Sequence, residues 1–379
     1  MAPAPGPSAR ALPAASSAPP AASATSAPVA ATTWYAVAGM RESGRRPLLY
    51  HEAHGVIGAT RDLRIQGDEL VEADLTSSEK PPPRQLGAFD RLQGPFPEQA
   101  WGVEEMAGPG DEVGVAFYRY RKQGWVWTKG FSSAEVPRVT GVAIGPGDRA
   151  LTLVRKPSDE TYSFHLLSGK KGDKLPRLGL TKGDRPLALA GLPTGEVFLA
   201  FSRDDDKVYV DRWAPGAEQA ERSVVPDAAV EGPLRHKLHM LLARGPNEAY
   251  LAGGDGYAKI SRFDGQRWTS LGLPPEHGLQ SYDVSPEGDV WAVEDGPESR
   301  EHPGQRQFSL WKRPAGKDAW QRIELGRVFL GGSAEAVPCD VMALAGGAVY
   351  VLADLTFDDG RRTVALLRER PPRGRTTDL

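Results

Sequence analysis

Two pairs of histidines are the residues whose type and spacing could bind a metal. His51 and His54 lie in the sequence HEAH, and His236 and His239 lie in RHKLH. Residues three apart share one face of a helix but point to opposite faces of a strand, and both pairs stand among sequences typical of strands. Neither pair has further ligands nearby or belongs to a His-Glu-x-x-His frame. We therefore predict no metal site, and we also predict no cofactor.

Clusters of acidic residues could instead bind calcium through their carboxylate oxygens. Asp204-Asp205-Asp206 and Asp358-Asp359-Gly360 each fall in a loop that we expect between a second and a third strand. The ligand spacing of an EF-hand loop is absent from both clusters. Charged residues at the tips of β-turns explain them better, so we predict turns here and no calcium site.

Adjacent carboxylates at Glu104-Glu105 and at Glu294-Asp295 could supply acid and base groups to an enzyme. Neighbours in sequence do not face each other across a substrate, which is the geometry that glycosidic acid and base pairs need. The chain also lacks a Gly-x-Ser-x-Gly elbow, a Walker loop, a dinucleotide-binding fingerprint and a Cys-x-x-Cys pair. We therefore assign no catalytic residue, and the sequence leaves enzymatic activity open while favouring its absence.

Composition indicates a globular protein with no bias toward nucleic acid. The chain has 379 residues, 40% of them hydrophobic, and a formal net charge of −3. Cys339 is the single cysteine, so no intrachain disulfide can form. No run of about 18 apolar residues occurs, so we predict no transmembrane segment. The 43 glycines and 33 prolines are spread along the chain, which suits many short strands better than long helices.

The first 33 residues consist almost wholly of Ala, Pro, Ser, Gly and Thr. Such a segment buries too little apolar surface to offset its chain entropy, so we predict a disordered linker over residues 1–33. It resembles the spacer that follows a lipoprotein or secretory signal in bacterial envelope proteins. We therefore expect a location in the cell envelope or outside the cell, with a signal and a lipid anchor lost ahead of Met1. The alternative is a cytoplasmic protein with a disordered tail.

The stretch Ala249–Leu271 holds the clearest structural unit in the chain. A strand that carries Tyr250 ends at Gly253-Gly254, and a second strand leads to Asp264-Gly265, a two-residue hairpin signal because that turn requires positive φ. With the strand that carries Trp268 and an apolar run upstream, we predict a four-stranded antiparallel meander over roughly residues 237–273. One such sheet cannot bury both of its faces alone, so it needs similar neighbours.

Similar strand–turn–strand units recur from Trp34 onward. The first apolar residues after their turns are Leu70, Val113, Ala150, Val197, Ala249, Val290 and Val349. Their mean spacing is about 46 residues, and four strands per repeat of 40–50 residues is the signature of a β-propeller. We predict an all-β protein with one β-propeller domain over residues 34–370, of four-stranded antiparallel blades. Seven blades are favoured and six are the alternative.

The strand expected over Trp34–Met40 lies ahead of the first repeat, and the last repeat is short. We predict that this strand completes the final blade and closes the ring, which removes an open sheet edge. The residues after the ring, 371–379, are predicted to form a basic tail in solvent. Six tryptophans fall in the outer strands and are predicted to pack between blades, while Trp34 and Trp101 could be exposed. The six are Trp125, Trp127, Trp213, Trp268, Trp311 and Trp320.

The clearest unit resembles a kelch-type repeat. The residues that carry the resemblance are Tyr250, Gly253, Gly254, Phe263, Asp264 and Trp268. The other units lack the double glycine or place it differently. Part of a sialidase-type Asp-box is also present at Ser261, Gly265 and Trp268, with Phe263 in the aspartate position. The resemblance implies a propeller for residues 34–370, and it transfers no active site.

We therefore predict a non-catalytic binding or scaffold module that recognises a protein, a glycan or a small ligand through one rim of the propeller. The alternative is a propeller hydrolase or lyase that acts on a polysaccharide or a lactone, with carboxylates or histidines converging at the central channel. An assembly scaffold with a broad apolar rim is a third reading. We expect a monomer that binds no nucleic acid. We expect the ligand at the face formed by the loops that join second to third strands and successive blades. The predicted binding residues in such loops are Arg203, Asp204, Asp255, Tyr257, Glu294, Asp295 and Asp358.

Overall fold

The computed structural model describes most of the chain between Trp34 and Glu369. The described residues are 34–40, 48–50, 55–57, 62–66, 69–72, 91–94, 99–107, 113–121, 124–132, 135, 141–156, 161–170, 172–203, 207–229, 240–253, 259–272, 278–298 and 306–369. The predicted linker over residues 1–33, the predicted tail over residues 371–379 and both histidine pairs lie outside them.

The described strands form seven antiparallel sheets, which are numbered here in chain order. Sheet 1 contains β2 (Leu48–Tyr50), β3 (Gly55–Ile57), β4 (Asp62–Gln66) and β5 (Glu69–Glu72). Sheet 2 contains β6 (Arg91–Gln93), β7 (Trp101–Ala107), β8 (Val113–Arg121) and β9 (Gly124–Ser132). Sheet 3 contains β10 (Ala143–Ile144), β11 (Ala150–Arg155) and β12 (Tyr162–Ser168). Sheet 4 contains β13 (Arg185–Gly191), β14 (Val197–Ser202), β15 (Lys207–Trp213) and β16 (Glu221–Ala229).

The remaining sheets complete the series. Sheet 5 contains β17 (Met240–Gly245), β18 (Glu248–Gly253), β19 (Lys259–Phe263) and β20 (Trp268–Ser270). Sheet 6 contains β21 (Gly278–Val284), β22 (Val290–Glu298), β23 (Arg306–Arg313) and β24 (Gln321–Ile323). Sheet 7 contains β25 (Arg327–Phe329), β26 (Ser333–Ala343), β27 (Val349–Phe357), β28 (Arg362–Glu369) and β1 (Trp34–Met40).

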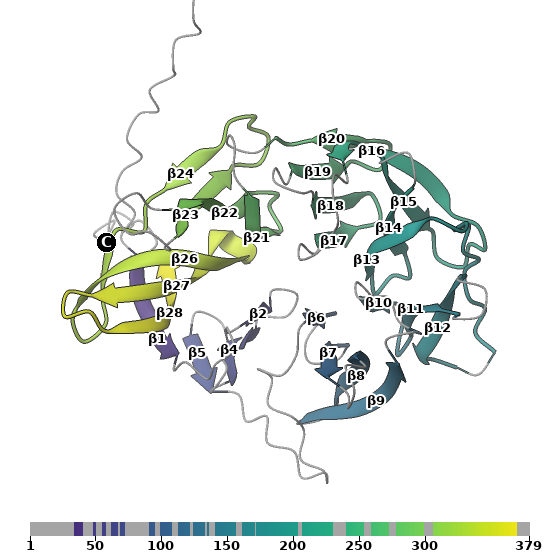
Figure 1. Ribbon diagram of the computed structural model, residues 1–379, viewed down its shortest axis with the longest axis horizontal. Helices are drawn as coiled ribbons and strands as arrows, with labels where there is room; N and C mark the ends of the chain where they lie inside the picture. Colours follow the sequence, from purple (N-terminus) through teal and green to yellow (C-terminus); the bar gives the residue numbers. More distant parts are fainter. Residues whose placement is uncertain are drawn as a thin grey trace, which may run out of the picture.

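The sheets follow one another around a common centre, which is the arrangement of a β-propeller (Figure 1). The first strand of sheets 1 to 6, and β26 in sheet 7, lies nearest the centre, and later strands lie progressively further out. Helix is almost absent from the described residues, where it is limited to a 3-10 turn at Ala345–Gly347. No helix that could cross a membrane is found among those residues. The prediction of an all-β protein is confirmed.

The strand nearest the N-terminus joins the last sheet. β1 pairs antiparallel with β28, from Trp34 opposite Glu369 to Met40 opposite Val364. The first and last parts of the chain are therefore hydrogen-bonded in one sheet, as predicted. This pairing covers the outer edge of β28, which would otherwise expose a row of unpaired backbone groups.

Sheet 5 agrees closely with the unit predicted around Ala249–Leu271. Its four strands pair in sequence order, and β18 ends at Gly253. Gly265 adopts a φ of 92°, a conformation that glycine favours. The turn lies one residue later than predicted, because the N–H of Asp264 donates to the carbonyl of Arg267 at 3.2 Å and leaves Gly265 and Gln266 between them. The Asp264 carboxylate stabilises this turn by accepting hydrogen bonds from the N–H groups of Gln266 and Arg267, at 3.0 and 2.9 Å.

Five of the seven predicted repeat positions fall in the second strand of a sheet, where the strands of sheet 7 are counted outward from β26. They are Ala150, Val197, Ala249, Val290 and Val349. The other two do not. Val113 begins the third strand of sheet 2, and Leu70 lies in the fourth strand of sheet 1. The true second strand of sheet 2 begins at Trp101, where no Gly-Asp or Pro-Gly turn signal precedes it. Turn residues alone therefore placed these two repeats on the wrong strand.

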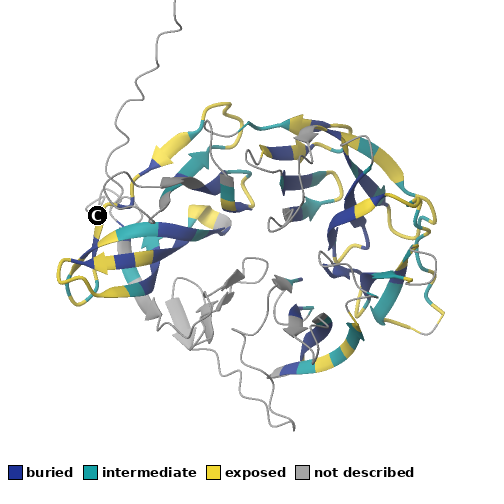
Figure 2. Cartoon of the chain, in the orientation of Figure 1, coloured by how far each residue is buried: buried dark blue, intermediate teal, exposed yellow. Residues whose placement is uncertain are grey.

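Buried apolar clusters fill the spaces between successive sheets from sheet 2 to sheet 7. Figure 2 shows buried residues along the strands and exposed residues mainly at turns and on outer strands. Most of the outer-strand tryptophans are buried or half-buried as predicted, but Trp127 on β9 is 57% exposed. Trp34 and Trp101, which the sequence left as candidates for exposure, are both buried. Each lies on a strand whose side chains face a neighbouring sheet.

Two glycines allow the inner strands of sheets 3 and 4 to approach closely. A Cβ atom on Gly191 would lie 2.5 Å from the carbonyl oxygen of Ile144, and one on Gly141 would lie 2.5 Å from that of Leu189. Gln93 of sheet 2 also reaches this point, donating to the carbonyl of Leu189 and accepting from the N–H of Val142. Three inner strands therefore converge here, at the centre of the ring.

A pairing of aromatic and cationic residues recurs in five sheets. The aromatic residue lies in the second strand, and the cation lies directly opposite it in the third. The pairs are Trp101–Arg119, Phe198–Arg212, Tyr250–Arg262, Trp291–Lys312 and Tyr350–Arg368. In all but the phenylalanine pair, the cation lies 5.0–6.0 Å from the ring centroid. Sheet 3 departs from the pattern, with Leu151 opposite Leu166.

Candidate ligand-binding groove

A groove of about 900 Å³ lies between sheets 3 and 4. It is formed where four connections meet: those that follow β10, β12, β13 and β15. In an antiparallel sheet, the first and third connections lie at one edge and the second lies at the opposite edge. The groove therefore opens on the face of the ring that carries the first and third turns of these sheets.

The floor of the groove is apolar. Val197, Trp213 and Leu175 line it, and Trp213 is only 1% exposed. The indole N–H of Trp213 donates to the carbonyl of Arg177 at 3.3 Å, and its ring packs edge-to-face on Phe164 at 5.2 Å. These contacts fix the indole in one orientation, so the floor is a preformed surface.

The rim carries charges of both signs. A guanidinium nitrogen of Arg149 donates to the carbonyl of Lys174 at 2.6 Å, which ties the first turn of sheet 3 to the segment after β12. The Lys174 ammonium lies 3.6 Å from the Glu218 carboxylate, across the groove in sheet 4. Both side chains are at least half exposed, so this ion pair contributes little stability and is free to exchange partners.

Sheet 2 also contacts the rim, through a hydrogen bond to Asp148 in the first turn of sheet 3. Arg119 of β8 donates to the Asp148 carboxylate at 2.5 Å. This hydrogen bond holds the pKa of Asp148 below its usual value, although partial burial opposes the shift. Asp148 is therefore anionic at neutral pH. Its carboxylate remains mostly exposed at the mouth of the groove.

Two glycines at the rim leave their main-chain atoms accessible to a ligand. Gly147 and Gly216 adopt φ values of 61° and 76°, in the left-handed region that favours glycine. A Cβ atom on either residue would meet nothing within 4 Å. A ligand can therefore approach the main chain of both turns without displacing a side chain.

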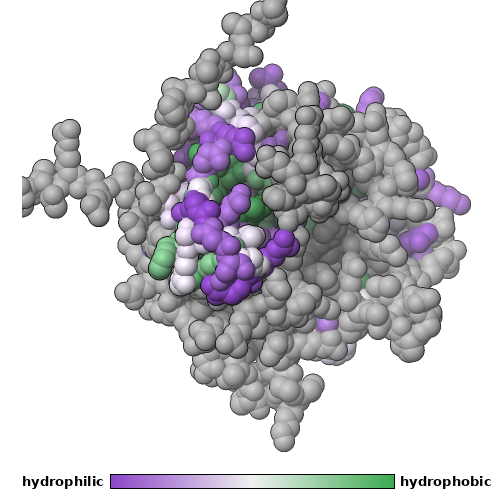
Figure 3. Space-filling model, turned by 60° about the vertical axis from the view of Figure 1, so that its left-hand side comes forward, coloured by the Kyte–Doolittle hydropathy of each residue, from purple (hydrophilic) through white to green (hydrophobic). Residues whose placement is uncertain are grey.

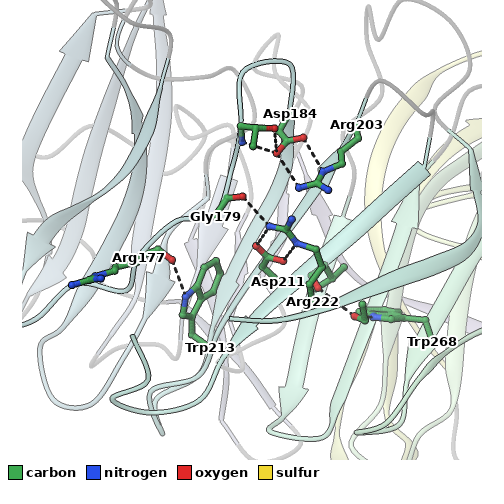
Figure 4. A network of polar contacts seen from close by, with 11 residues as sticks. Arg177, Gly179, Asp184, Arg203, Asp211, Trp213, Arg222 and Trp268 are labelled. Atoms are coloured by element: carbon green, nitrogen blue, oxygen red, sulfur yellow. Dashed lines mark hydrogen bonds and ion pairs between the residues drawn. The ribbon is translucent and has the colours of Figure 1, made fainter. Parts of the chain in front are cut away.

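A polar network on sheet 4 bonds to the segment after β12, whose first residues line the groove (Figure 4). Arg222 makes two hydrogen bonds to the buried Asp211 carboxylate, at 2.6 and 2.8 Å, and a third of 3.1 Å to the carbonyl of Gly179. The bonds to Asp211 raise the pKa of Arg222, although partial burial opposes the shift. At the far end of the same segment, Arg203 pairs with Asp184 at 3.0 Å. The segment after β12 is thereby attached to sheet 4.

The predicted binding residues lie elsewhere. Arg203 belongs to the polar network, and Glu294 is buried, where it accepts a hydrogen bond of 2.6 Å from the indole of Trp311. Asp358 lies in the exposed turn after β27 and pairs with Arg327 at 2.5 Å. Asp295 lies on β22 opposite Gly278. Asp204, Asp255 and Tyr257 fall outside the described residues.

The groove and the predicted rim use different connections. The predicted residues lie on or next to connections between second and third strands, whereas the groove is made by first and third connections. Binding at the predicted rim stays a prediction. Pro146-Gly147 and Pro215-Gly216 mark two of the groove turns in the sequence. They identify turns only, and nothing in the sequence indicates that turns from two sheets converge.

The described acidic residues that the sequence singled out as candidates, and a second recess, lie outside the groove. No group of three or more His, Cys, Asp or Glu side chains able to hold a metal ion occurs among the described residues. Glu104 is buried and accepts a hydrogen bond of 3.1 Å from the Tyr118 hydroxyl.

A smaller recess of about 260 Å³ lies between sheets 6 and 7. Figure 3 turns the sheet 7 side forward and shows hydrophilic residues around an apolar patch.

Comparisons with known proteins show similarity to solved structures alone. No protein-family model and no curated protein sequence matches the chain. YCF48 bound to a D1 peptide is 13% identical, with a TM-score of 0.30, over 59% of this chain and 66% of that one. A prolyl endopeptidase is 11% identical, with a TM-score of 0.45, over 90% and 51%.

The β-propeller domain of the trilobed protease from Pyrococcus furiosus is 10% identical, with a TM-score of 0.34, over 72% of this chain and 84% of that one. The chain thus spans only about half of the prolyl endopeptidase and 66% of YCF48. At these scores, what those proteins bind or cleave is not transferred to this chain.

Proposed function

We propose that this protein is a binding module that recognises a short segment of another protein in the groove between sheets 3 and 4. The observation that carries the proposal is the apolar floor of Val197, Trp213 and Leu175 beneath a rim with charges of both signs. Apolar burial supplies affinity, and a few placed polar groups supply orientation. A peptide offers the matching combination of apolar side chains, charged side chains and backbone hydrogen-bonding groups.

The electrostatics of the rim support a peptide over a uniformly charged ligand. Arg149 and Lys174 are balanced by Asp148 and Glu218, so the groove has no strong excess of either sign. The pair of Lys174 and Glu218 is exposed and weak. A ligand that presents one acidic and one basic group can replace it at little cost. A small molecule or a glycan that carries both an apolar face and polar groups remains an alternative ligand.

The rival function is a propeller hydrolase or lyase, which needs acidic or basic groups available to a substrate. Buried carboxylates in the described residues have donors from the protein itself. Glu104 accepts from Tyr118, Glu294 accepts from Trp311, and Asp211 accepts from Arg222. These contacts support structural roles for the three carboxylates. The groove therefore supports binding more directly than it supports catalysis.

We further propose that the seven sheets are the seven blades of one propeller, closed by β1 in the last blade. The kelch-like residues of sheet 5 serve as turn and packing residues within such a blade. A location in the bacterial cell envelope, with residues 1–33 as a spacer, follows from the composition of that segment. We propose a monomer, because the groove is built from turns of one chain.

Selection from a random hexapeptide library, with the whole chain immobilised, tests the proposed function. Ala217 lines the groove in the turn after β15, so Ala217→Trp should fill the groove and abolish enrichment. Lys317 occupies the matching position in sheet 6, where its N–H bonds to the carbonyl of Pro314 as that of Ala217 bonds to Ala214, both at 3.0 Å. Lys317→Trp is therefore the matched control.

Peptides enriched by the wild type and by Lys317→Trp, but lost with Ala217→Trp, would support the groove as the binding site. Circular dichroism melts should show that both variants remain folded. Equal enrichment by all three proteins, or enrichment by none, would reject the groove as a peptide site. Mass spectra of the recovered peptides separate the rival function, because a hydrolase would return cleaved products.

A further inference from the structure

We propose that β12, the outer strand of sheet 3, accepts an extended segment of a partner polypeptide as the fourth strand of its sheet. Among the described residues, sheet 3 alone has three strands, and every other sheet has four or five. Ladder hydrogen bonds from β12 run to β11. The opposite edge of β12 is therefore the outer edge of the sheet (Figure 1). The inference does not depend on the groove.

The segment that follows β12 forms no strand beside β12, and two of its backbone groups, at Arg177 and Gly179, bond to sheet 4 instead. The N–H of Arg177 donates to the carbonyl of Glu218 at 2.9 Å, and the carbonyl of Gly179 accepts from Arg222. Figure 4 shows two side-chain bonds to the same segment, from Trp213 of β15 to Arg177 and from Arg222 of β16 to Gly179. Within the described part of the chain, alternate N–H and C=O groups of Phe164–Ser168 are thus directed away from β11 with no strand beside them.

Side-chain burial also indicates an incomplete sheet. In β8, the third strand of sheet 2, every residue from Val115 to Tyr120 is buried. In β12, the third strand of sheet 3, Phe164 is the one buried residue of seven. Leu166 and Leu167 are only partly buried, although they pack on the clusters to either side. An added strand would cover both of these leucines.

The residue at the centre of this edge departs from the repeat. Leu166 lies opposite Leu151, at the position where the five aromatic pairs of the other sheets place Arg or Lys. The charged end of a cation at that position can extend into water. Exposure of a leucine side chain to water is unfavourable, so a strand that covered Leu166 would stabilise the sheet. The one sheet that lacks a fourth strand therefore carries an apolar residue where a strand would dock.

The geometry favours a single extended segment over a folded sheet or a second copy of this chain. Sheets 2 and 4 on either side have fourth strands, β9 and β16, and so extend one strand further from the centre. Strands are spaced by about 4.8 Å, so the edge of β12 is recessed by that depth. An extended chain of about seven residues fits this position, with an apolar side chain beside Leu166.

A tethered peptide of defined sequence takes the place of the partner in a test of the proposal. The probe has the sequence of β9, Gly124–Ser132, and is joined by a glycine linker and a disulfide to Lys170→Cys in the otherwise intact chain. Lys170 is exposed just beyond β12, and the native Cys339 is buried. A short tether gives an effective concentration in the millimolar range, so even weak strand addition should be detected. Hydrogen exchange measured by mass spectrometry reports the protection of β12.

We expect the tethered probe to slow exchange of β12 amides by about tenfold or more. The same probe with alternate residues replaced by proline should not, because proline cannot donate to the ladder. Leu166→Arg removes the apolar side chain that would pack against the added strand and should reduce protection. Val224→Arg, on the exposed face of β16, is the matched control and should leave protection unchanged.

Three results would overturn the proposal. The tethered probe could leave β12 exchange unchanged, or the proline probe could protect β12 equally well. Protection of β12 in the free protein would show that its edge is already covered by this chain or by a second copy. Sedimentation of the untethered protein shows whether it is a monomer or a dimer, and so whether the same chain or a second copy covers the edge.

Discussion

A guanidinium nitrogen of Arg244 in sheet 5 lies 2.5 Å from a carboxylate oxygen of Asp283 in sheet 6 and donates a hydrogen bond to it. The Asp283 side chain is fully buried. Its other carboxylate oxygen accepts a hydrogen bond of 2.8 Å from the backbone N–H of Ala343 in sheet 7. One buried carboxylate therefore connects three successive sheets near the centre of the ring.

Removal of this carboxylate should destabilise the whole ring. We expect Asp283→Ala to lower the free energy of unfolding by about 3 kcal/mol, because it removes the counter-ion of Arg244 and the acceptor of the Ala343 N–H. Urea denaturation followed by tryptophan fluorescence measures the change. Asp318→Ala removes the exposed partner of Arg313 and should change stability little. Similar small effects for both variants would show that Asp283 does not hold the sheets together.

The close approach of sheets 3 and 4 predicts that Gly191 is intolerant of a side chain. A Cβ atom at this position would meet backbone atoms of Ile144 and Ala143 at 2.5–2.8 Å, so the inner strands must separate. We expect Gly191→Ala to cost about 1–3 kcal/mol of folding free energy, measured by thermal and urea unfolding. Gly145→Ala is the control, because its Cβ atom would meet only the Arg149 side chain at 3.4 Å. Equal stability of the two variants would contradict the close approach.

The recurring aromatic and cationic pairs should contribute measurable coupling energy. The Lys312 ammonium lies 5.0 Å from the ring centroid of Trp291, and both residues are largely shielded from water. A double-mutant cycle with Trp291→Leu and Lys312→Met should give a coupling of about 0.5–1 kcal/mol. Lys317→Met, in the exposed turn after β23, replaces Lys312→Met in the control cycle. A coupling no larger than that of the control would limit these pairs to a steric role.

Stability should depend on pH through His165. Burial and the nearby Lys129 ammonium lower the pKa of His165 below its usual value of 6.5, while the Glu135 carboxylate opposes the shift. The imidazole also packs edge-to-face on Phe131 at 5.1 Å. Because the unfolded chain takes up this proton at a higher pH than the folded chain does, stability is retained above about pH 6.5 and falls below it.

A comparison of unfolding free energies at about pH 7.5 and about pH 5.5 tests this prediction. The wild type should lose more stability on acidification than His165→Gln, which has no proton to gain. Parallel pH profiles for the two proteins would remove His165 as a source of the dependence.

The sequence by itself determined the features that depend on a few neighbouring residues. Gly253 ends a strand of sheet 5, and Gly265 marks a turn because its positive φ favours glycine. The repeat spacing predicted an all-β ring, and the unassigned strand at Trp34–Met40 predicted the closure of the last sheet. Both inferences succeed because each strand carries its own pattern of apolar residues and turns.

Tertiary structure alone decided which residues meet between sheets. The alternation along β9 does not reveal that Trp127 points to solvent while Trp125 is buried, since both rings are equally apolar. Nor does the sequence show that turns of sheets 3 and 4 form one groove, or that Leu166 stands where other sheets carry a cation. These features depend on strand register and on which sheet lies alongside. Register and sheet order arise from contacts between residues far apart in the chain, which no local pattern records.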